Sequence, residues 1–314
     1  MYKPKLTYIS TKDMSYEDWL RARKDGIGGS DAGAICGLNP YRSAIAVYQD
    51  KISNDIEDSD NESMRIGRDL ESYVAERFVE ATGKKVRCKN AIIKNEDFPF
   101  MYANVDRMVV GEDAGLECKT ASAYSADKWA DGNIPESYQI QCHHYMAVTG
   151  AEAWYIACVI FGKGFVYQKI ERDEEIISNL VEIEKKFWYD NVCSKVMPDP
   201  DGSKASDELI EKYFGKVTED KSIVLTGFDD ELNRRSELKE LIDRLSTEKK
   251  AIEQRIKLYM EDSESAVSEK YRVTWKGVLT SRLDSKALKA EHPDLYEHYL
   301  KECSSRRFTV KAIA

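Results

Sequence analysis

Residues 101–120 read Met-Tyr-Ala-Asn-Val-Asp-Arg-Met-Val-Val-Gly-Glu-Asp-Ala-Gly-Leu-Glu-Cys-Lys-Thr, and this stretch decides the predicted fold. Apolar residues flank a polar turn at Gly111 to Gly115, so the pattern predicts a β-hairpin. Residues two apart in a strand point to the same side, which places Glu117 and Lys119 on one face. The turn brings the preceding strand, and with it Asp106, back beside them. Two carboxylates and one amine that converge in this way suit a magnesium-dependent phosphodiesterase.

The Glu-x-Lys spacing carries little weight by itself, because charge-rich helices also contain it. Only Glu117 and Lys119 lie in a predicted strand with an acid on the strand before it. For this hairpin taken alone, a surface ion pair across two strands stays open as the alternative. The same spacing recurs in predicted helical stretches, where the two side chains do not share a face, at Glu184/Lys186, Glu237/Lys239 and Glu248/Lys250.

The composition indicates a folded core with a very polar surface. The chain has 314 residues, of which 42% are hydrophobic and 33% charged, and its net charge is −9. This length allows one large domain or two smaller ones. A protein that only holds DNA is usually basic, so the charge argues mildly against a passive DNA binder. It argues less against a nuclease, whose clustered carboxylates are partly neutralised by bound metal.

Neither a membrane anchor nor a disulfide framework is expected. The sequence has no run of about 18 apolar residues, and its first residues lack the apolar stretch of a signal peptide. We therefore expect a cytoplasmic protein, in the host cell if a phage or prophage encodes it. The seven cysteines are scattered and form no C-x-x-C pair, which favours reduced thiols over a zinc site. An iron–sulfur nuclease is disfavoured as well, since its cluster needs about four thiolates.

The patterning predicts an α/β chain in which helices precede and follow a group of strands. Met197 to Ser203, rich in proline and aspartate, is the best boundary. We expect a core over residues 1–200, a linker over 201–228, and a C-terminal helical extension with a small strand pair over 229–314. The predicted helices span residues 15–24, 32–37, 44–51, 64–82, 135–148, 173–193, 229–260 and 284–303. The predicted strands span residues 85–95, 101–110, 115–120, 153–161, 165–170, 271–280 and 306–313.

The extension begins with a long charged helix over residues 229–260. Apolar residues recur in it at the spacings of a coiled-coil seam. A helix of this kind could recruit a partner or self-associate. The seam consists of Leu238, Ile242, Leu245, Ile252, Ile256 and Tyr259.

Two helices contribute polar residues that support a nuclease site. Glu71 shares a helix face with apolar residues three and seven positions later, so we expect it to point toward the core. A carboxylate there is costly unless it is paired or bound to metal. Gln141 lies on one helical stripe with Tyr138 and Tyr145 and could hold a water or a phosphate.

A candidate anion site lies near the start of the chain. Arg23 precedes a glycine-rich loop, Gly26-Ile-Gly-Gly-Ser30-Asp31, which runs into the predicted helix over residues 32–37. A loop of this kind before a helix is a place where anions bind. Arg23 and Ser30 are therefore expected to grip a phosphate.

Read in order, these segments resemble the motifs of the YqaJ viral recombinase family. That family is related to phage lambda exonuclease and belongs to the restriction-endonuclease-like, PD-(D/E)xK superfamily. The resemblance runs from residue 18 to residue 192. It rests on Arg23 with Gly28-Gly29-Ser30-Asp31-Ala32 and Gly37-Leu38-Asn39-Pro40-Tyr41, then Gly67-Arg68-Asp69-Leu70-Glu71, Asn104-Val105-Asp106, Leu116-Glu117-Cys118-Lys119 and Gln141-Cys142-His143-His144-Tyr145-Met146.

The resemblance implies a restriction-endonuclease-like core, in which helices flank a central mixed sheet, and magnesium-dependent digestion of double-stranded DNA from a 5′ end. It implies that Asp106, Glu117 and the carbonyl of Cys118 bind the catalytic Mg²⁺, which Mn²⁺ can replace. It also implies that Lys119 positions or deprotonates the attacking water.

The resemblance further assigns Glu71 and Gln141 to the metal and water site, and Arg23 and Ser30 to the 5′ phosphate of a DNA end. It implies a partner, a RecT-like single-strand annealing protein. Because relatives form toroidal trimers, it also implies a homo-oligomer, while no membrane partner is expected.

Two other functions stay open at this point. An endonuclease of the same superfamily would cut closed circles as well as linear DNA. A non-catalytic recombination scaffold would act through the seam of the helix over residues 229–260, and a change of Glu117 would then leave recombination intact.

Overall fold

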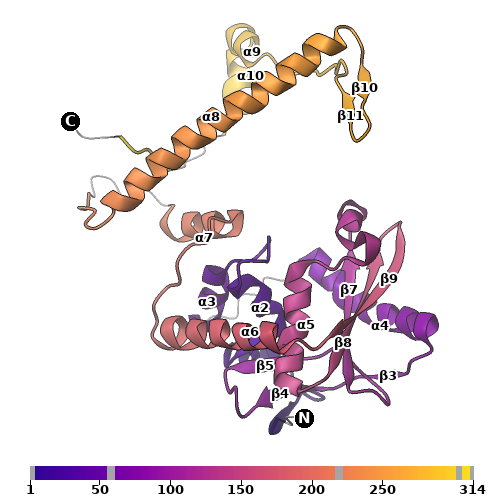
Figure 1. The fold of residues 1–314 in the computed structure, drawn as a ribbon. Helices are drawn as coiled ribbons and strands as arrows, with labels where there is room; N and C mark the ends of the chain where they lie inside the picture. The colour runs from indigo at the N-terminus through magenta and orange to yellow at the C-terminus, as the bar shows by residue number, and fades with distance from the viewer. Residues whose placement is uncertain (1–3, 55–60, 216–221, 302–305, 312–314) are drawn as a thin grey trace. The chain divides into compact units, whose positions relative to one another are not determined.

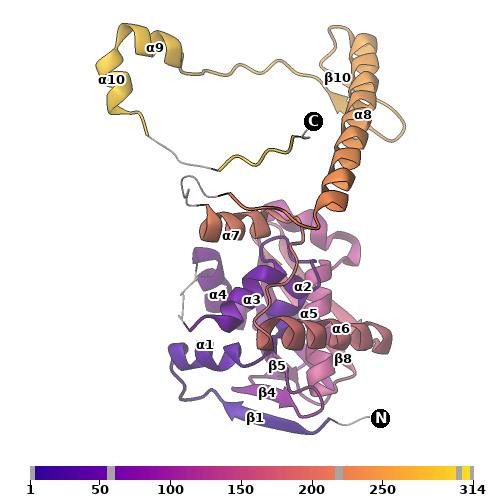
Figure 2. The ribbon, with the colours of Figure 1, turned by 90° about the vertical axis from the view of Figure 1, so that its left-hand side faces the viewer.

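The computed structural model describes residues 4–54, 61–215, 222–301 and 306–311. Its contacts separate two compact units, Met1–Tyr213 and Phe214–Ala314, and Figures 1 and 2 show the elements of both. The stretch expected as a linker, residues 201–228, contains helix α7 (Lys204–Phe214). Within the described residues, none of the helices is both long and apolar enough to span a lipid bilayer.

The first unit is built on a five-stranded mixed sheet in the order β3-β6-β7-β8-β9. Strands β7 and β8 run parallel, and the other neighbours are antiparallel. Parallel neighbours need a crossover connection, which here contains helix α5 (Glu136–Thr149). The strands are β3 (Val86–Arg87), β6 (Arg107–Val109), β7 (Ala114–Ala121), β8 (Ala153–Ile160) and β9 (Gly164–Glu171).

Helices cover both faces of this sheet. Alternate residues of β8 point to opposite sides, so the strand contributes side chains to a core on each face. Tyr155 packs against Phe78 of helix α4 (Glu62–Thr82), with the ring centroids 5.2 Å apart. Trp154 and Ile156 belong to the larger core, which lies beneath α5. Figure 1 shows α4 and α5 on opposite sides of β8. A mixed sheet between helices confirms the predicted fold class.

A second, four-stranded sheet has the order β1-β4-β5-β2. The predicted strands over 85–95 and 101–110 were wrong as single strands, since the structure divides each of them between the two sheets. The second predicted strand breaks at Asp106. The carboxylate of this residue accepts a hydrogen bond from the Cys118 N–H of β7, and the backbone there does not continue along β5. The strands are β1 (Leu6–Ser10), β2 (Ile27–Gly28), β4 (Ala91–Asn95) and β5 (Met101–Asn104).

Helix α2 spans Gly29–Ile35 and begins before the predicted start at residue 32. The reason is that the Asp31 carboxylate, inside the first turn, accepts a hydrogen bond from the Gly28 N–H and caps the helix there. The remaining helical segments are α1 (Tyr16–Lys24), α3 (Ala44–Ile52), α6 (Glu174–Lys186), the 3₁₀ segment η1 (Ala123–Gly132) and the π-helical segment η2 (Phe187–Cys193).

The second unit contains the predicted long helix, α8 (Asp229–Met260). Its seam residues are exposed, from 38% at Ile256 to 90% at Tyr259. The predicted strand over 271–280 shortens to β11 (Arg272–Thr274), which pairs with β10 (Ser265–Val267).

The C-terminal helix predicted over residues 284–303 was wrong as a single helix. It is divided into α9 (Ser285–Glu291) and α10 (Pro293–His298), because Pro293 removes a backbone donor and restricts the residue before it. The predicted strand over 306–313 is absent from residues 306–311, and its last two residues lie outside the described part.

Gly115 and Gly67 offer a test of the packing around the central sheet. A Cβ atom on Gly115 would lie 2.2 Å from the buried Trp154 ring, whereas one on Gly67 would meet nothing closer than 3.8 Å. We expect Gly115→Ala to lower the free energy of unfolding by about 1–3 kcal/mol. Gly67→Ala, inside helix α4, should raise it by up to about 1 kcal/mol. Urea denaturation of both variants checks this, and equal effects of the two changes would contradict the packing described.

Candidate active site

Glu117 and Lys119 lie side by side on β7 and face α5. The Glu117 side chain is almost completely buried, with 3% of the residue exposed. Its Oε1 atom accepts hydrogen bonds from Lys119 Nζ at 2.5 Å and from Gln141 Nε2 at 2.7 Å. The period of two in the strand thus brings together the carboxylate and the amine as the sequence predicts.

Asp106 enters this site from the neighbouring strand. It directly precedes β6, which pairs with β7 through Arg107 opposite Leu116. Asp106 Oδ2 accepts a hydrogen bond from the Cys118 N–H at 2.8 Å, which fixes the carboxylate against β7. Burial raises the pKa of Asp106 well above its ordinary value, and the negative charges of Glu117 and Glu71 raise it further.

Glu71 comes to the same region from helix α4 and is half-buried. Its side chain is 33% exposed and forms an ion pair with Arg107. Arg107 also donates to the Asp106 carbonyl oxygen at 2.7 Å and to Ser72 Oγ at 3.2 Å. Glu71 was expected to point toward the core and to need a partner there; it is half-buried, and the guanidinium of Arg107 on β6 is that partner.

Lys119 keeps its proton in this arrangement. Burial alone would lower the pKa of Lys119, but the nearby charge of Glu117, together with Tyr138 and Asp106, raises it above the ordinary value. Its ammonium nitrogen lies 4.8 Å from the centre of the Tyr138 ring, where the face of the ring attracts a cation. A protonated amine donates hydrogen bonds and cannot accept a proton.

The carboxylate oxygens of Asp106 and Glu117 suit a hard divalent cation. Among the described residues, no group donates a hydrogen bond to the buried Glu117 Oε2 atom. A buried carboxylate oxygen without a partner is costly, and a bound cation would satisfy it. The described residues contain no group of three His, Cys, Asp or Glu side chains placed to hold a metal ion. A metal held by Asp106, Glu117 and a backbone carbonyl would therefore keep several waters, as Mg²⁺ usually does.

Helix α5 connects the carboxylates to the glycine-rich loop. Gln141 Nε2 also donates to the hydroxyl of Tyr145 at 2.9 Å. The Tyr145 ring lies against the backbone of Gly29, where an added Cβ atom would be 2.5 Å from the ring. Only glycine permits this approach, so one buried tyrosine contacts both parts of the candidate site.

The predicted anion-binding residues also lie together. Arg23 Nη2 donates to Ser30 Oγ at 3.0 Å. The Arg23 guanidinium lies 4.6 Å from the centre of the Trp19 ring. Ser30 is exposed and Arg23 is half-buried, so a ligand can reach both side chains.

Several polar contacts around these sites were not foreseen from the sequence. Arg107 follows Asp106 directly, and its place in the chain was the only signal for it. Asp31 and Lys51 form a buried ion pair at 2.9 Å. His144 is buried against Glu184 at 2.8 Å. The partners come from separate helices, so spacing along the chain could not reveal them.

The mixed sheet, with Asp106 beside a Glu-x-Lys unit, defines a restriction-endonuclease-like core. Residues 18–152 match the family model of the YqaJ-like viral recombinase domain. The chain is 41% identical over 306 residues to the Uncharacterized protein YqaJ of Bacillus subtilis (strain 168), an alignment that covers 96% of each protein. The chain therefore belongs to the YqaJ-like viral recombinase family.

Solved structures share the fold. An alkaline exonuclease from Laribacter hongkongensis, LHK-Exo, superimposes with a TM-score of 0.50 at 18% identity, over 63% of this chain and 97% of that chain. LHK-Exo in complex with dAMP gives the same values. At this level of identity the likeness shows a common fold.

The raised pKa of Asp106 predicts a cost of ionising this group in the metal-free protein. A raised carboxyl pKa means that the folded state binds more protons, so stability falls as pH rises above the ordinary value of 3.8. Asp106→Asn, which keeps an acceptor for the Cys118 N–H, should therefore unfold at a higher temperature than the wild type at pH 7.5 in EDTA. The difference should shrink as pH approaches 4. Thermal denaturation across this range checks it, and a variant less stable at every pH would contradict it.

Proposed function

We propose that the protein is a Mg²⁺-dependent exonuclease that degrades double-stranded DNA from its ends, in the 5′ to 3′ direction. The observation that carries this proposal is the buried Glu117 carboxylate beside Asp106. One of its oxygens is bonded to Lys119 and Gln141, and the other has no donor in the part of the chain that the structure describes. Membership in a viral recombinase family and the fold shared with an alkaline exonuclease support the same reaction class.

The residues that would hold the metal are Asp106, Glu117 and the carbonyl of Cys118, with Glu71 close by. A bound Mg²⁺, or Mn²⁺ in its place, would polarise the scissile phosphate and lower the pKa of a bound water. Asp106 and Glu117 are hard oxygen ligands that suit both ions. The hydrogen bond from the Cys118 N–H holds Asp106 in place for this role.

Lys119 and Gln141 would act on the water and on the phosphate. Because Lys119 is protonated, it would orient the attacking water and stabilise negative charge as it develops on the phosphate. Gln141 holds Glu117 Oε1 with its amide N–H. Its second contact, with the Tyr145 hydroxyl, limits the orientations that the amide can take.

Arg23 and Ser30 would hold the 5′ phosphate of the DNA end. A guanidinium and a hydroxyl that already contact each other present several donors to one anion. Such a site favours ends over internal positions, and this preference separates an exonuclease from an endonuclease of the same fold. The resemblance to the family adds two proposals, a RecT-like annealing partner and a trimeric assembly.

The central prediction concerns Lys119. Purified protein with Mg²⁺ should shorten linear duplex DNA, and Lys119→Ala should reduce the rate by at least about 100-fold, because charge stabilisation at the reacting phosphate is lost. Lys186→Ala is the matched control, since Lys186 belongs to a Glu-x-Lys unit of the same spacing on helix α6 and is exposed. Gel assays with both variants check this.

Binding of the metal can be measured apart from the reaction. Mg²⁺ or Mn²⁺ should raise the unfolding temperature of the wild type, since a ligand that binds only the folded state stabilises it. Glu117→Gln should remove this response. A wild-type protein that degrades no DNA with either metal would refute the proposal.

The exonuclease assignment makes a prediction about DNA ends. The wild type should degrade 5′-phosphorylated duplexes faster than 5′-hydroxyl duplexes, and Arg23→Ala should lose the difference, because a charge-assisted contact with the phosphate is gone. Arg21→Ala is the control on the same helix, since Arg21 pairs with Asp18 and Glu17 instead. Equal cutting of closed circular DNA would indicate an endonuclease.

A further inference from the structure

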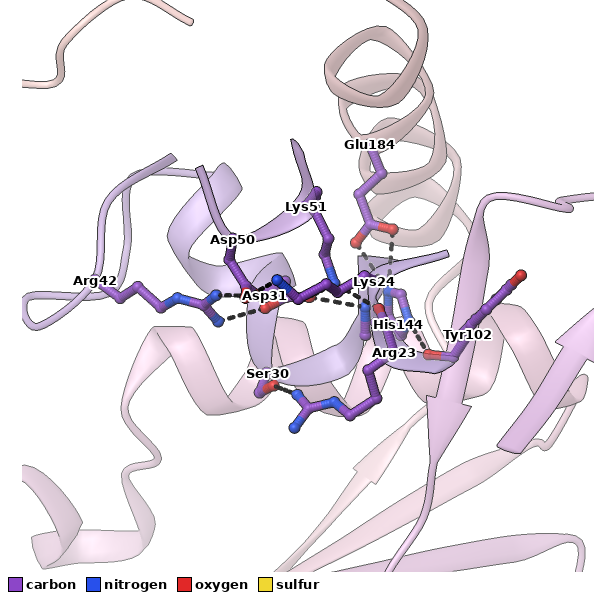
Figure 3. Close-up of polar contacts among 11 residues, drawn as sticks. Arg23, Lys24, Ser30, Asp31, Arg42, Asp50, Lys51, Tyr102, His144 and Glu184 are labelled. Carbon is purple, nitrogen blue, oxygen red and sulfur yellow. Dashed lines mark hydrogen bonds and ion pairs between the residues drawn. The ribbon is translucent and has the colours of Figure 1, made fainter. Parts of the chain in front are cut away.

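A buried ion pair lies next to the Arg23–Ser30 contact. Lys51, from helix α3, and Asp31, from helix α2, are joined at 2.9 Å, and their side chains are 2% and 1% exposed. Figure 3 shows the pair between Arg42 and Asp50 on one side and Arg23 on the other. Both charges are shut away from water, so neither side chain can itself touch DNA.

The same pair holds both ends of the loop that separates Arg23 from Ser30. Lys51 Nζ donates a hydrogen bond to the Arg23 carbonyl oxygen at 2.8 Å, where helix α1 ends. Asp31 Oδ2, the oxygen that Lys51 contacts, accepts a hydrogen bond from the Gly28 N–H at 3.1 Å, just before Ser30. The chain from residue 23 to residue 28 is therefore closed by a bridge of two side chains.

Further charges keep the Asp31 carboxylate ionised, while burial lowers the pKa of Lys51. Burial alone would raise the pKa of Asp31, but the positive charges of Lys51, Arg42 and Arg23 hold it far below the ordinary value. Arg42 contacts Asp31 Oδ1 at 2.5 Å and Asp50 at 3.0 Å. A buried ion pair contributes little to stability compared with apolar residues of the same size, whereas it can fix one geometry among several. Because the Asp31–Lys51 pair spans the loop, the geometry that it can fix is that of residues 23–28.

We propose that Asp31 and Lys51 are positioning residues that fix the Arg23 guanidinium at the distance from Ser30 at which both bind one terminal phosphate. This inference rests on the proposed function of Arg23 and Ser30 and extends it to two residues that do not contact the DNA. The pair sets the selectivity for phosphorylated ends, while the contacts of Arg23 and Ser30 supply the binding.

Lys51→Met tests the bridge formed by Asp31 and Lys51, called the clamp below, in the full-length protein. Methionine fills a similar volume without the charge, and Asp31 keeps Arg42 and the Gly28 N–H as partners. The measured quantity is the ratio of dissociation constants for a 5′-hydroxyl and a 5′-phosphorylated duplex, read by fluorescence anisotropy in EDTA so that no DNA is cut. The wild type should prefer the phosphorylated end by about tenfold or more. In Lys51→Met the preference should fall below about threefold, because the Arg23 side chain loses its fixed position.

The control separates positioning from stability. Glu184→Gln also breaks a fully buried pair, but its partner His144 bonds the Tyr102 carbonyl, whereas the clamp bonds the Arg23 carbonyl and the Gly28 N–H. Glu184→Gln should lower the unfolding temperature and keep the wild-type preference. If Lys51→Met does not fold, Asp31→Asn is the second variant, since it removes the charge and keeps an acceptor for the Gly28 N–H, and its preference should fall in the same direction.

The outcomes distinguish the inference from the function on which it rests. A folded Lys51→Met protein with the full wild-type preference would overturn the clamp and leave the phosphate site intact. A wild type without any preference would overturn the phosphate site itself. Equal losses of preference in Lys51→Met and Glu184→Gln would show an effect of stability alone and would also overturn the clamp.

Discussion

The burial of one carboxylate, that of Glu117, constrains the rest of the site. A charged side chain in the middle of a sheet needs donors, and the chain supplies them from β7 through Lys119 and from α5 through Gln141. The adjacent Asp106 adds a second negative charge that the sheet holds through a backbone N–H. The arrangement is costly without a counter-charge, and this cost is the physical reason that it suits a cation.

Much of this arrangement follows from local patterns in the sequence. The period of two places Glu117 beside Lys119, the period of 3.6 places Gln141 beside Tyr145, and glycine or proline marks some of the helix ends, such as Gly83 and Gly150. The same patterns fail where a side chain from elsewhere decides the backbone. Asp106 interrupts a strand because its partner is the Cys118 N–H. Glu71 pairs with Arg107 of β6, and no periodicity indicates such a pairing.

The two parts of the candidate site are supported in different ways. Glu117 lies on β7, inside a parallel pair of strands whose hydrogen-bonded ladder fixes the backbone, and Asp106 directly precedes β6, the other neighbour of β7. Arg23 and Ser30 lie at the two ends of a segment that contains just a two-residue strand, β2, so side chains contribute to their position. This difference explains why the site on the central sheet can be predicted from the sequence, whereas the support of the loop by Lys51 is visible only in three dimensions.

The contact between Gly29 and the Tyr145 ring has a consequence for the evolution of the family. Because no side chain fits between them, the two positions cannot vary independently. A relative with a larger residue at the first position must carry a smaller one at the second, and would thereby lose the hydroxyl that holds Gln141. A substitution in the glycine loop would therefore also disturb the chemistry at Glu117, through Tyr145 and Gln141.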